Sequence, residues 1–232
     1  MKIGVIGAMD VEVARLRAVL ARRADTAAAG MEFSEGEISG VPCVIVQSGV
    51  GKVNAALCAQ VLASVFGVTH VLNTGVAGSL DAAIDICDIV VSTDCVYHDV
   101  DATNFGYEPG QVPGMPAASF AADPALRAAV LAAAASAAPN VSAHEGRIAS
   151  GDQFIRDDVA KRAIVRQFGA RCCEMEGAAI AHACTVNAIP FVIIRAISDK
   201  ADGSREMMYP VFERIAADEC ARIVVEFFRS LP

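Results

Sequence analysis

Short apolar runs rich in β-branched residues alternate along the chain with segments that have the apolar spacing of helices. The runs predict strands, and the spaced segments predict helices that connect them. Strands are expected at residues 2–7, 41–48, 70–75, 88–98, 146–152 and 190–198, with a further short strand before Glu176. Helices are expected to follow Asp10, Lys52, Asp123, Asp157, Glu176 and Tyr209.

The predicted strands are nearly all apolar and are joined through helices. Strands of this kind are typical of parallel sheets that are buried on both faces. The pattern therefore predicts a central, largely parallel sheet covered by helices on both sides. Because no internal repeat and no long linker interrupts the alternation, one α/β domain over residues 1–232 is favoured.

The longest irregular stretch runs from Asp99 to Ser119 and reads DVDATNFGYEPGQVPGMPAAS. Its glycines and prolines favour a fixed irregular shape over a helix. A loop of this length in a compact domain is usually functional or part of an interface.

Composition narrows the class of partner. The formal net charge is −8, which argues against a nucleic-acid backbone or an anionic membrane surface, since both favour clustered Lys and Arg. The start MKIGVIGAMD does not have the pattern of a signal peptide, and no apolar run reaches the length of a membrane span. The eight cysteines form no CxxC pair and no zinc-finger spacing, so we expect core thiols in a reducing cytoplasm and no metal site.

Two glycine motifs suggest nucleotide binding but do not complete the pattern. At SGVGKVNAA, which begins at Ser48, a phosphate-binding loop would need Gly five positions before Gly51 and Ser or Thr after Lys52, but the chain has Val46 and Val53 there. In GVIGAM, Gly4 lies within the predicted strand and the third glycine of a dinucleotide fingerprint is missing. We therefore expect no nucleotide cofactor and no other cofactor.

Three carboxylates from distant parts of the chain are more informative. Glu12 follows the first strand, Glu176 begins a helix in CCEMEGAAIAHAC, and Asp199 follows the buried run PFVIIRAIS. Each alone is equally well explained as a helix cap or as compensation of a helix dipole. Ligands of open α/β sheets bind beyond the carboxyl ends of strands, so the three together with NTGVAGS favour one binding site.

Seven motifs in order carry a resemblance to a known family: IGAMDVEV, SGVGKVNAA, NTGVAGS, YHDVDATNFGYEPGQVPGMP, SGDQFI, EMEGAAIA and RAISDKAD. From Met1 to about Glu226, the sequence resembles the 5′-methylthioadenosine/S-adenosylhomocysteine nucleosidases, a branch of the nucleoside phosphorylase superfamily. The resemblance implies a single α/β domain with a mixed, twisted central sheet, usually in a homodimer. It also implies hydrolysis of the adenine–ribose bond of 5′-methylthioadenosine and S-adenosylhomocysteine, and in addition that of 5′-deoxyadenosine, in methionine salvage or the methyl cycle.

The matching motifs imply catalytic roles. Asp199 would protonate adenine N7, with a pKa raised by desolvation at its strand end, and Glu12 would activate the attacking water. Glu176 would accept hydrogen bonds from the ribose hydroxyls, its charge made tolerable by the helix N-terminus. Arg195 would help to hold the water and the base, while Glu174 is expected to face outward or to form a structural pair.

The same match implies a set of binding residues. Phe154 and Ile155 would contact the purine, Met175 would pack on the ribose, and Ser198 would orient the acid or the purine edge. Gly78 would let the backbone approach the ligand. The apolar members of this set could equally be plain core residues.

An apolar slot is needed for an uncharged 5′-methylthio group. Met9, Val50 and Tyr209 are its candidates within the chain, and Phe105 and Pro113 resemble residues that the family contributes across its dimer interface. Two positions depart from the family: Val76 stands where many relatives carry Ser, and Tyr209 where Phe is common.

Three alternatives remain open on this scaffold. A nucleoside phosphorylase would need a cationic phosphate site after the first strand, where the nearest arginine is Arg15. A hydrolase of futalosine-like nucleosides would use the same fold. A non-catalytic nucleoside-binding protein would not need a matched acid and base.

Overall fold

The computed structural model describes residues 1–199 and 209–231, with side chains throughout except at 209–213. Within these residues the chain forms ten strands, six α-helices and one short 3-10 helix, η1. Their bounds are β1 Ile3–Gly7, α1 Asp10–Ala18, β2 Ala21–Ala28, β3 Met31–Ile38, β4 Val41–Gln47, α2 Lys52–Ser64, β5 His70–Ser79, β6 Ile89–Tyr97, η1 Thr103–Phe105, β7 Ser119–Ala121, α3 Pro124–Ala137, β8 Ala143–Ser150, α4 Asp158–Phe168, β9 Cys172–Glu174, α5 Gly177–Val186, β10 Phe191–Asp199 and α6 Tyr209–Ser230.

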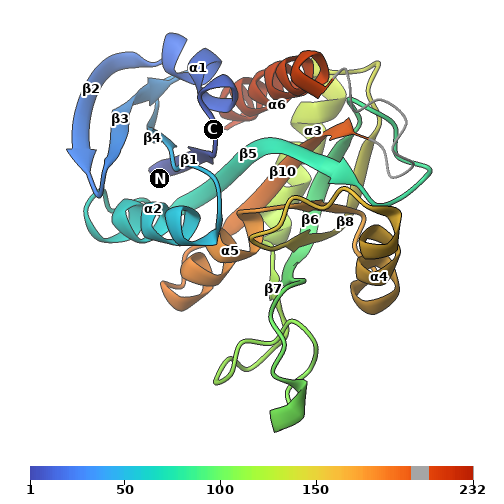
Figure 1. Cartoon of the computed structure of the whole chain (residues 1–232). Coiled ribbons are helices and arrows are strands. Elements are labelled where there is room, and N and C mark those ends of the chain that lie inside the picture. The colour runs from blue at the N-terminus through green and yellow to red at the C-terminus, as the bar shows by residue number, and fades with distance from the viewer. Residues whose placement is uncertain (200–208, 232) are drawn as a thin grey trace.

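All ten strands belong to one mixed sheet, and the prediction of a largely parallel sheet is wrong (Figure 1). β5 pairs in parallel with β1 and β10 but antiparallel with β9, and β10 pairs antiparallel with β6. Strands β5, β10, β6, β8 and β9 therefore close into a ring, while β1, β4, β3 and β2 extend the sheet from β5. The mixed sheet implied by the family resemblance is confirmed.

The apolar periodicity identified the buried elements correctly and missed the exposed ones. All six helices and the six long apolar strands are confirmed, as is the short strand before Glu176. The hairpin strands β2 and β3 were not predicted, because β2 reads ARRADTAA and seven of its eight residues are exposed. β7 has three residues within and just after the predicted irregular stretch, too few to produce a periodic signal.

Helices cover both sides of the sheet, as predicted, and produce two large cores and a smaller third core that includes residues of α4 (Figure 1). Alternate residues of β1 point to opposite cores: Ile3 and Val5 pack with α1, α3 and α6, whereas Ile6 packs with α2 and α5. Seven of the eight cysteines are buried and all eight are free thiols, consistent with the predicted core role. No helix among the described residues has both the length and the apolar character that a membrane crossing requires.

Residues 98–118 project from the body between β6 and β7 (Figure 1). This segment corresponds to the predicted irregular stretch, and it contains the short 3-10 helix η1. Phe105 is 79% exposed and Pro113 is also exposed, so both lie on the surface of this single chain.

Candidate active site

A cavity of about 160 Å³ opens where β1, β4, β5 and β10 end. Segments 151–155 and 175–176, which follow β8 and β9, complete its wall. The predicted site residues that line it are Met9, Glu12, Val50, Val76, Gly78, Phe154, Ile155, Met175, Glu176, Ser198 and Asp199. The acids thus meet as predicted, although β9 brings Glu176 in antiparallel to β5 and not along a shared parallel edge.

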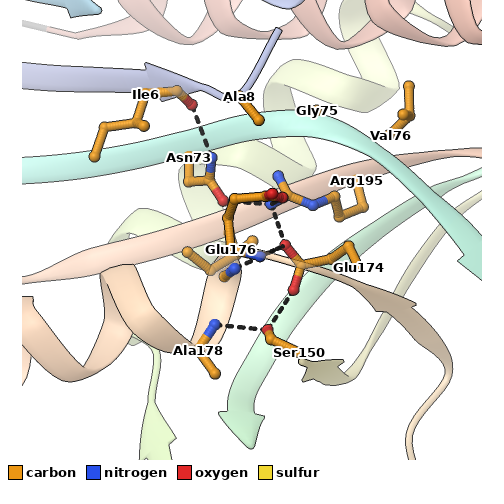
Figure 2. Close-up of polar contacts among 12 residues, drawn as sticks. Ile6, Ala8, Asn73, Gly75, Val76, Ser150, Glu174, Glu176, Ala178 and Arg195 are labelled. Atoms are coloured by element: carbon orange, nitrogen blue, oxygen red, sulfur yellow. Dashed lines mark hydrogen bonds and ion pairs between the residues drawn. The ribbon is translucent and has the colours of Figure 1, made fainter. Parts of the chain in front are cut away.

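Arg195 on β10 is the buried cation behind this cavity, with 2% of its side chain exposed. Its Nη2 donates to Asn73 Oδ1 at 2.5 Å and to the Glu174 carboxylate. Asn73 in turn donates to the Ile6 carbonyl oxygen at 2.8 Å, which links β10 through β5 to β1 (Figure 2). Burial alone would lower the pKa of Arg195, but the carboxylates around it, Glu174 first, raise its pKa above the usual value.

Glu174 is the ion-pair partner of Arg195, and its side chain also caps the start of α5. One carboxylate oxygen accepts from the Ser150 hydroxyl, and the other accepts from the backbone N–H groups of Glu176 at 3.0 Å and Gly177 at 2.7 Å. Although burial favours the neutral acid, Arg195 and Ser150 hold the pKa of Glu174 below its ordinary value. Of the two alternatives predicted for Glu174, the structural pair is confirmed and the outward orientation is wrong.

Glu176 is buried next to the Arg195–Glu174 ion pair, but its carboxylate lies farther from Arg195 than that of Glu174 does. Its Oε1 accepts from the Gly51 N–H at 2.8 Å, and its Oε2 lies 3.9 Å from Arg195 Nη2. Burial, and then the Glu174 charge, raise the pKa of Glu176 to about 7, against the opposing effect of Arg195. The Glu176 side chain makes no capping bond to α5, which is capped by Glu174 instead.

Glu12 reaches the cavity from the first turn of α1 and is 3% exposed. Its Oε2 accepts from the N–H groups of Ala8 at 2.6 Å and Met9 at 3.0 Å, and its Oε1 accepts from Val76 N–H at 3.1 Å. The prediction that Glu12 caps a helix is therefore correct for Oε2, which caps α1, whereas Oε1 accepts from the backbone of β5. Burial raises the pKa of Glu12, opposed by Arg195 and by these three N–H groups.

Asp199 lies across the cavity at an irregular end of β10. The pairing with β5 shifts between Ile197 and Asp199, a bulge that turns the carboxylate toward the cavity. Its Oδ1 accepts from the Ser198 hydroxyl at 3.1 Å, and its Oδ2 lies 3.8 Å from Lys161 Nζ. A quarter of this side chain is exposed, so Asp199 is less deeply buried than Glu12 and Glu176.

The chain carries the signature of a known superfamily. The sequence profile of the phosphorylase superfamily matches residues 2–229. A 5′-methylthioadenosine/S-adenosylhomocysteine nucleosidase of Treponema pallidum is 41% identical over 253 residues, which cover 100% of this chain and 94% of the relative. The chain belongs to this nucleosidase family. As a member, it is an N-glycosidic hydrolase.

Solved structures agree with this family. The nucleosidase of Colwellia psychrerythraea in complex with adenine is similar with a TM-score of 0.94 and 41% identity, covering 99% of this chain and 95% of that one. Futalosine hydrolase of Helicobacter pylori has a TM-score of 0.93 and 32% identity, covering 100% and 98%. The fold is thus shared by nucleosidases that differ in substrate.

Some residues implied by the nucleosidase family do not meet the cavity in this chain. Phe105 and Pro113 are exposed on the projecting segment and do not line it. The side chain of Tyr209 lies outside those that the structure describes. Arg195 stands behind the wall and acts on the cavity through its carboxylate partners.

Several site residues were missed from the sequence: Asn73, Gly75, Ser150 and Lys161, with Glu174 left undecided. A signal existed for part of this set, because Arg195 interrupts an apolar strand and a buried guanidinium requires a carboxylate partner. Asn73 and Ser150 are likewise polar positions in buried strands. Among the described residues no cluster of His, Cys, Asp and Glu side chains has the arrangement of a metal site.

Gly75 is required because a Cβ there would lie 2.6 Å from Glu12 Oε1 and 3.1 Å from Arg195 Nη1. We expect Gly75→Ala to lower kcat/KM for nucleoside hydrolysis by about a hundredfold, because the methyl group displaces Glu12. Gly30→Ala is the control, since Gly30 has φ +76° in a surface turn with open space around it. It should cost stability in thermal denaturation while leaving the kinetics unchanged; equal kinetics in both variants would contradict the prediction.

The raised pKa of Glu176 makes stability depend on pH. The folded chain holds the proton of Glu176 more tightly than the unfolded chain does. The protonated side chain therefore contributes its full stabilisation of the fold below about pH 4.5, and this stabilisation is lost as pH rises to about 7. Glu176→Gln removes that loss while keeping an acceptor for Gly51. Urea denaturation should therefore favour the variant over wild type by about 2 kcal/mol more at pH 8 than at pH 5. Parallel pH curves for the two proteins would show that Glu176 titrates normally.

Proposed function

We propose that the chain hydrolyses the N-glycosidic bond of 5′-methylthioadenosine and S-adenosylhomocysteine, and also that of 5′-deoxyadenosine. The products are adenine and the corresponding 5-substituted ribose. The observation that carries this proposal is the charge balance of the site: three buried carboxylates, Glu12, Glu174 and Glu176, surround one guanidinium, Arg195. Such an excess of negative charge favours a cation, and ribose becomes cation-like as its bond to adenine breaks.

Each acid then has a distinct task. Water adds to ribose C1′ as the bond to adenine N9 breaks, and Glu12 accepts the proton that this water loses. Asp199 donates a proton to adenine N7, so that adenine leaves as a neutral molecule. Glu176 binds the ribose hydroxyls and lies next to the developing positive charge.

Apolar side chains at the opening suit the rest of the substrate. Phe154 and Val50 are 59% and 48% exposed, a state in which a purine or a methylthio group gains from covering them. Val76 holds Glu12 through its backbone N–H, so the side-chain difference from relatives leaves this contact intact. In our proposal the chain acts as a homodimer in which Phe105 and Pro113 of one copy close the 5′ end of the other copy's cavity.

The charge of the cavity argues against the phosphorylase alternative. Phosphate beside Glu12 and Glu176 would face two carboxylates, and the buried guanidinium nearby is already ion-paired with Glu174. The free cysteines are consistent with work in a reducing cytoplasm, where the reaction would serve methionine salvage or the methyl cycle.

Adenine release from methylthioadenosine, with and without inorganic phosphate, tests the proposed function directly. We expect the same rate in both conditions and free methylthioribose as the second product, measured by chromatography. Release that requires phosphate would establish a phosphorylase instead. A futalosine-like nucleoside cleaved much faster than methylthioadenosine would assign the other hydrolase activity, and adenine binding without any release would indicate a binding protein.

Asp199→Asn and Glu12→Gln test the roles of acid and base. Each should lower kcat by a factor of about 10² or more, because a positioned acid or base contributes 10²–10⁴ to the rate. Adenine affinity measured by calorimetry should fall little in Glu12→Gln, since Glu12 acts on the water. Near-normal turnover by Asp199→Asn, or a loss of binding with unchanged kcat in Glu12→Gln, would reject the respective assignment.

A further inference from the structure

Outside the catalytic residues, one cluster of charges connects three segments near the cavity. Lys52 Nζ lies 2.6 Å from Asp99 Oδ2 and 3.7 Å from Asp152 Oδ2. The Lys52 and Asp99 side chains are 21% and 11% exposed, so this is a largely buried ion pair. It joins the start of α2, the base of the projecting segment and the loop 151–155.

The start of α2 is where this cluster meets the ribose side of the cavity. Gly51, the N-cap residue of α2, has φ +97° and no side chain with which to cap the helix. Its N–H donates to Glu176 at 2.8 Å, so the orientation of Glu176 depends on the backbone next to Lys52. The cap comes from elsewhere, because Asp152 Oδ1 accepts from Lys52 N–H at 2.8 Å.

The loop 151–155 is where the cluster meets the opposite side. Asp99 Oδ2 accepts from Asp152 N–H at 2.9 Å as well as from Lys52. Two residues further on, Phe154 lines the cavity. Gly151 makes this close approach possible, since a Cβ there would lie 2.4 Å from the His98 ring.

Electrostatics make Lys52 the member on which the cluster depends. It is the ammonium group between two carboxylates, and its hydrogen bond, with that of Asp152 N–H, lowers the pKa of Asp99 although burial acts in the opposite direction. Without this ammonium, Asp99 would be a buried charge that faces the carboxylate of Asp152. A buried charge left without its partner is strongly unfavourable. Relief of that repulsion would move the loop 151–155 away from α2.

We propose that Lys52 is a positioning residue for this site: its ion pair with Asp99 holds the loop 151–155 against the start of α2, which fixes the spacing between Phe154 and Glu176. This inference rests on the proposed nucleosidase function, because that function assigns one side to the purine and the other to the ribose. A fixed spacing lets one nucleoside contact both sides at once.

The test compares variants of the full-length chain by adenine affinity and by steady-state kinetics with methylthioadenosine, all well below their melting temperatures. Lys52→Met should raise KM for methylthioadenosine by about tenfold, because a 1 Å displacement is enough to weaken contacts made on both sides at once, and Lys52→Arg should restore KM. The Kd for adenine, which contacts the purine side alone, should change little. Gly151→Ala should produce the same change with every charge retained, since its methyl group pushes the loop off His98.

Arg147→Met is the matched control. Arg147 pairs with Asp94 at 2.6 Å, with side chains 36% and 16% exposed, and neither residue lines the cavity. Arg147→Met should lose about as much stability as Lys52→Met while keeping the wild-type KM for methylthioadenosine and the wild-type adenine affinity.

The outcomes separate this inference from the proposed function. Wild-type adenine release reports on the function, whereas ratios between variants and wild type report on Lys52. A wild-type KM for methylthioadenosine in Lys52→Met, or an equal rise in KM in Arg147→Met, would overturn the inference. If Lys52→Met does not fold, Gly151→Ala decides: an unchanged KM for methylthioadenosine there would overturn the inference, and a tenfold rise in KM would support it.

Discussion

The buried ion pair between Arg195 and Glu174 is the contact on which the rest of the site depends. A charge withdrawn from water is tolerated only when it has a partner and hydrogen bonds, and the chain supplies these from several strands. Asn73 on β5 accepts from the guanidinium, while Ser150 and the N–H groups of Glu176 and Gly177 donate to the carboxylate. The same contacts therefore hold β10 to β5, end β8 and begin α5. Once they form, the position of Glu176 at the cavity wall follows.

The unequal sharing of one cation among three carboxylates then determines the chemistry. Glu174 is in contact with Arg195 and has a lowered pKa, whereas Glu12 and Glu176 are attracted from further away and have raised values. Neighbouring acids whose pKa values are pushed apart can serve as structural anion, base and sugar ligand within one cavity. In the proposed reaction, this arrangement is unfavourable for the empty site at neutral pH and would become favourable when positive charge develops on bound ribose. The chain would then be less stable at the position where the proposed catalysis needs negative charge.

Sequence patterns predicted the elements that burial controls and missed those that it does not. The apolar strands and all six helices followed from periodicity, but the exposed hairpin β2–β3 carries no such signal. Strand direction was also wrong, because β6 and β9 are as apolar as their parallel neighbours although they run antiparallel to β10 and β5. For the site, family motifs identified most of the cavity wall. They assigned Glu176 to the ribose but left open whether Glu174 faces outward or forms a structural pair, since its partner Arg195 comes from a distant strand.

Two of the helices that begin at the cavity, α2 and α5, start at a residue whose own side chain does not cap the helix, and this links the site to the fold. Glu176 precedes α5 but leaves the capping to Glu174, which frees its own carboxylate to bind Gly51. Gly51 precedes α2 and receives its cap from Asp152, which frees its N–H for Glu176. Each helix start therefore depends on a loop that also contributes to the cavity. These shared hydrogen bonds lie at the cavity wall. A substitution that breaks one of them should therefore act first on the spacing between the proposed purine and ribose contacts and only then on the stability of either helix.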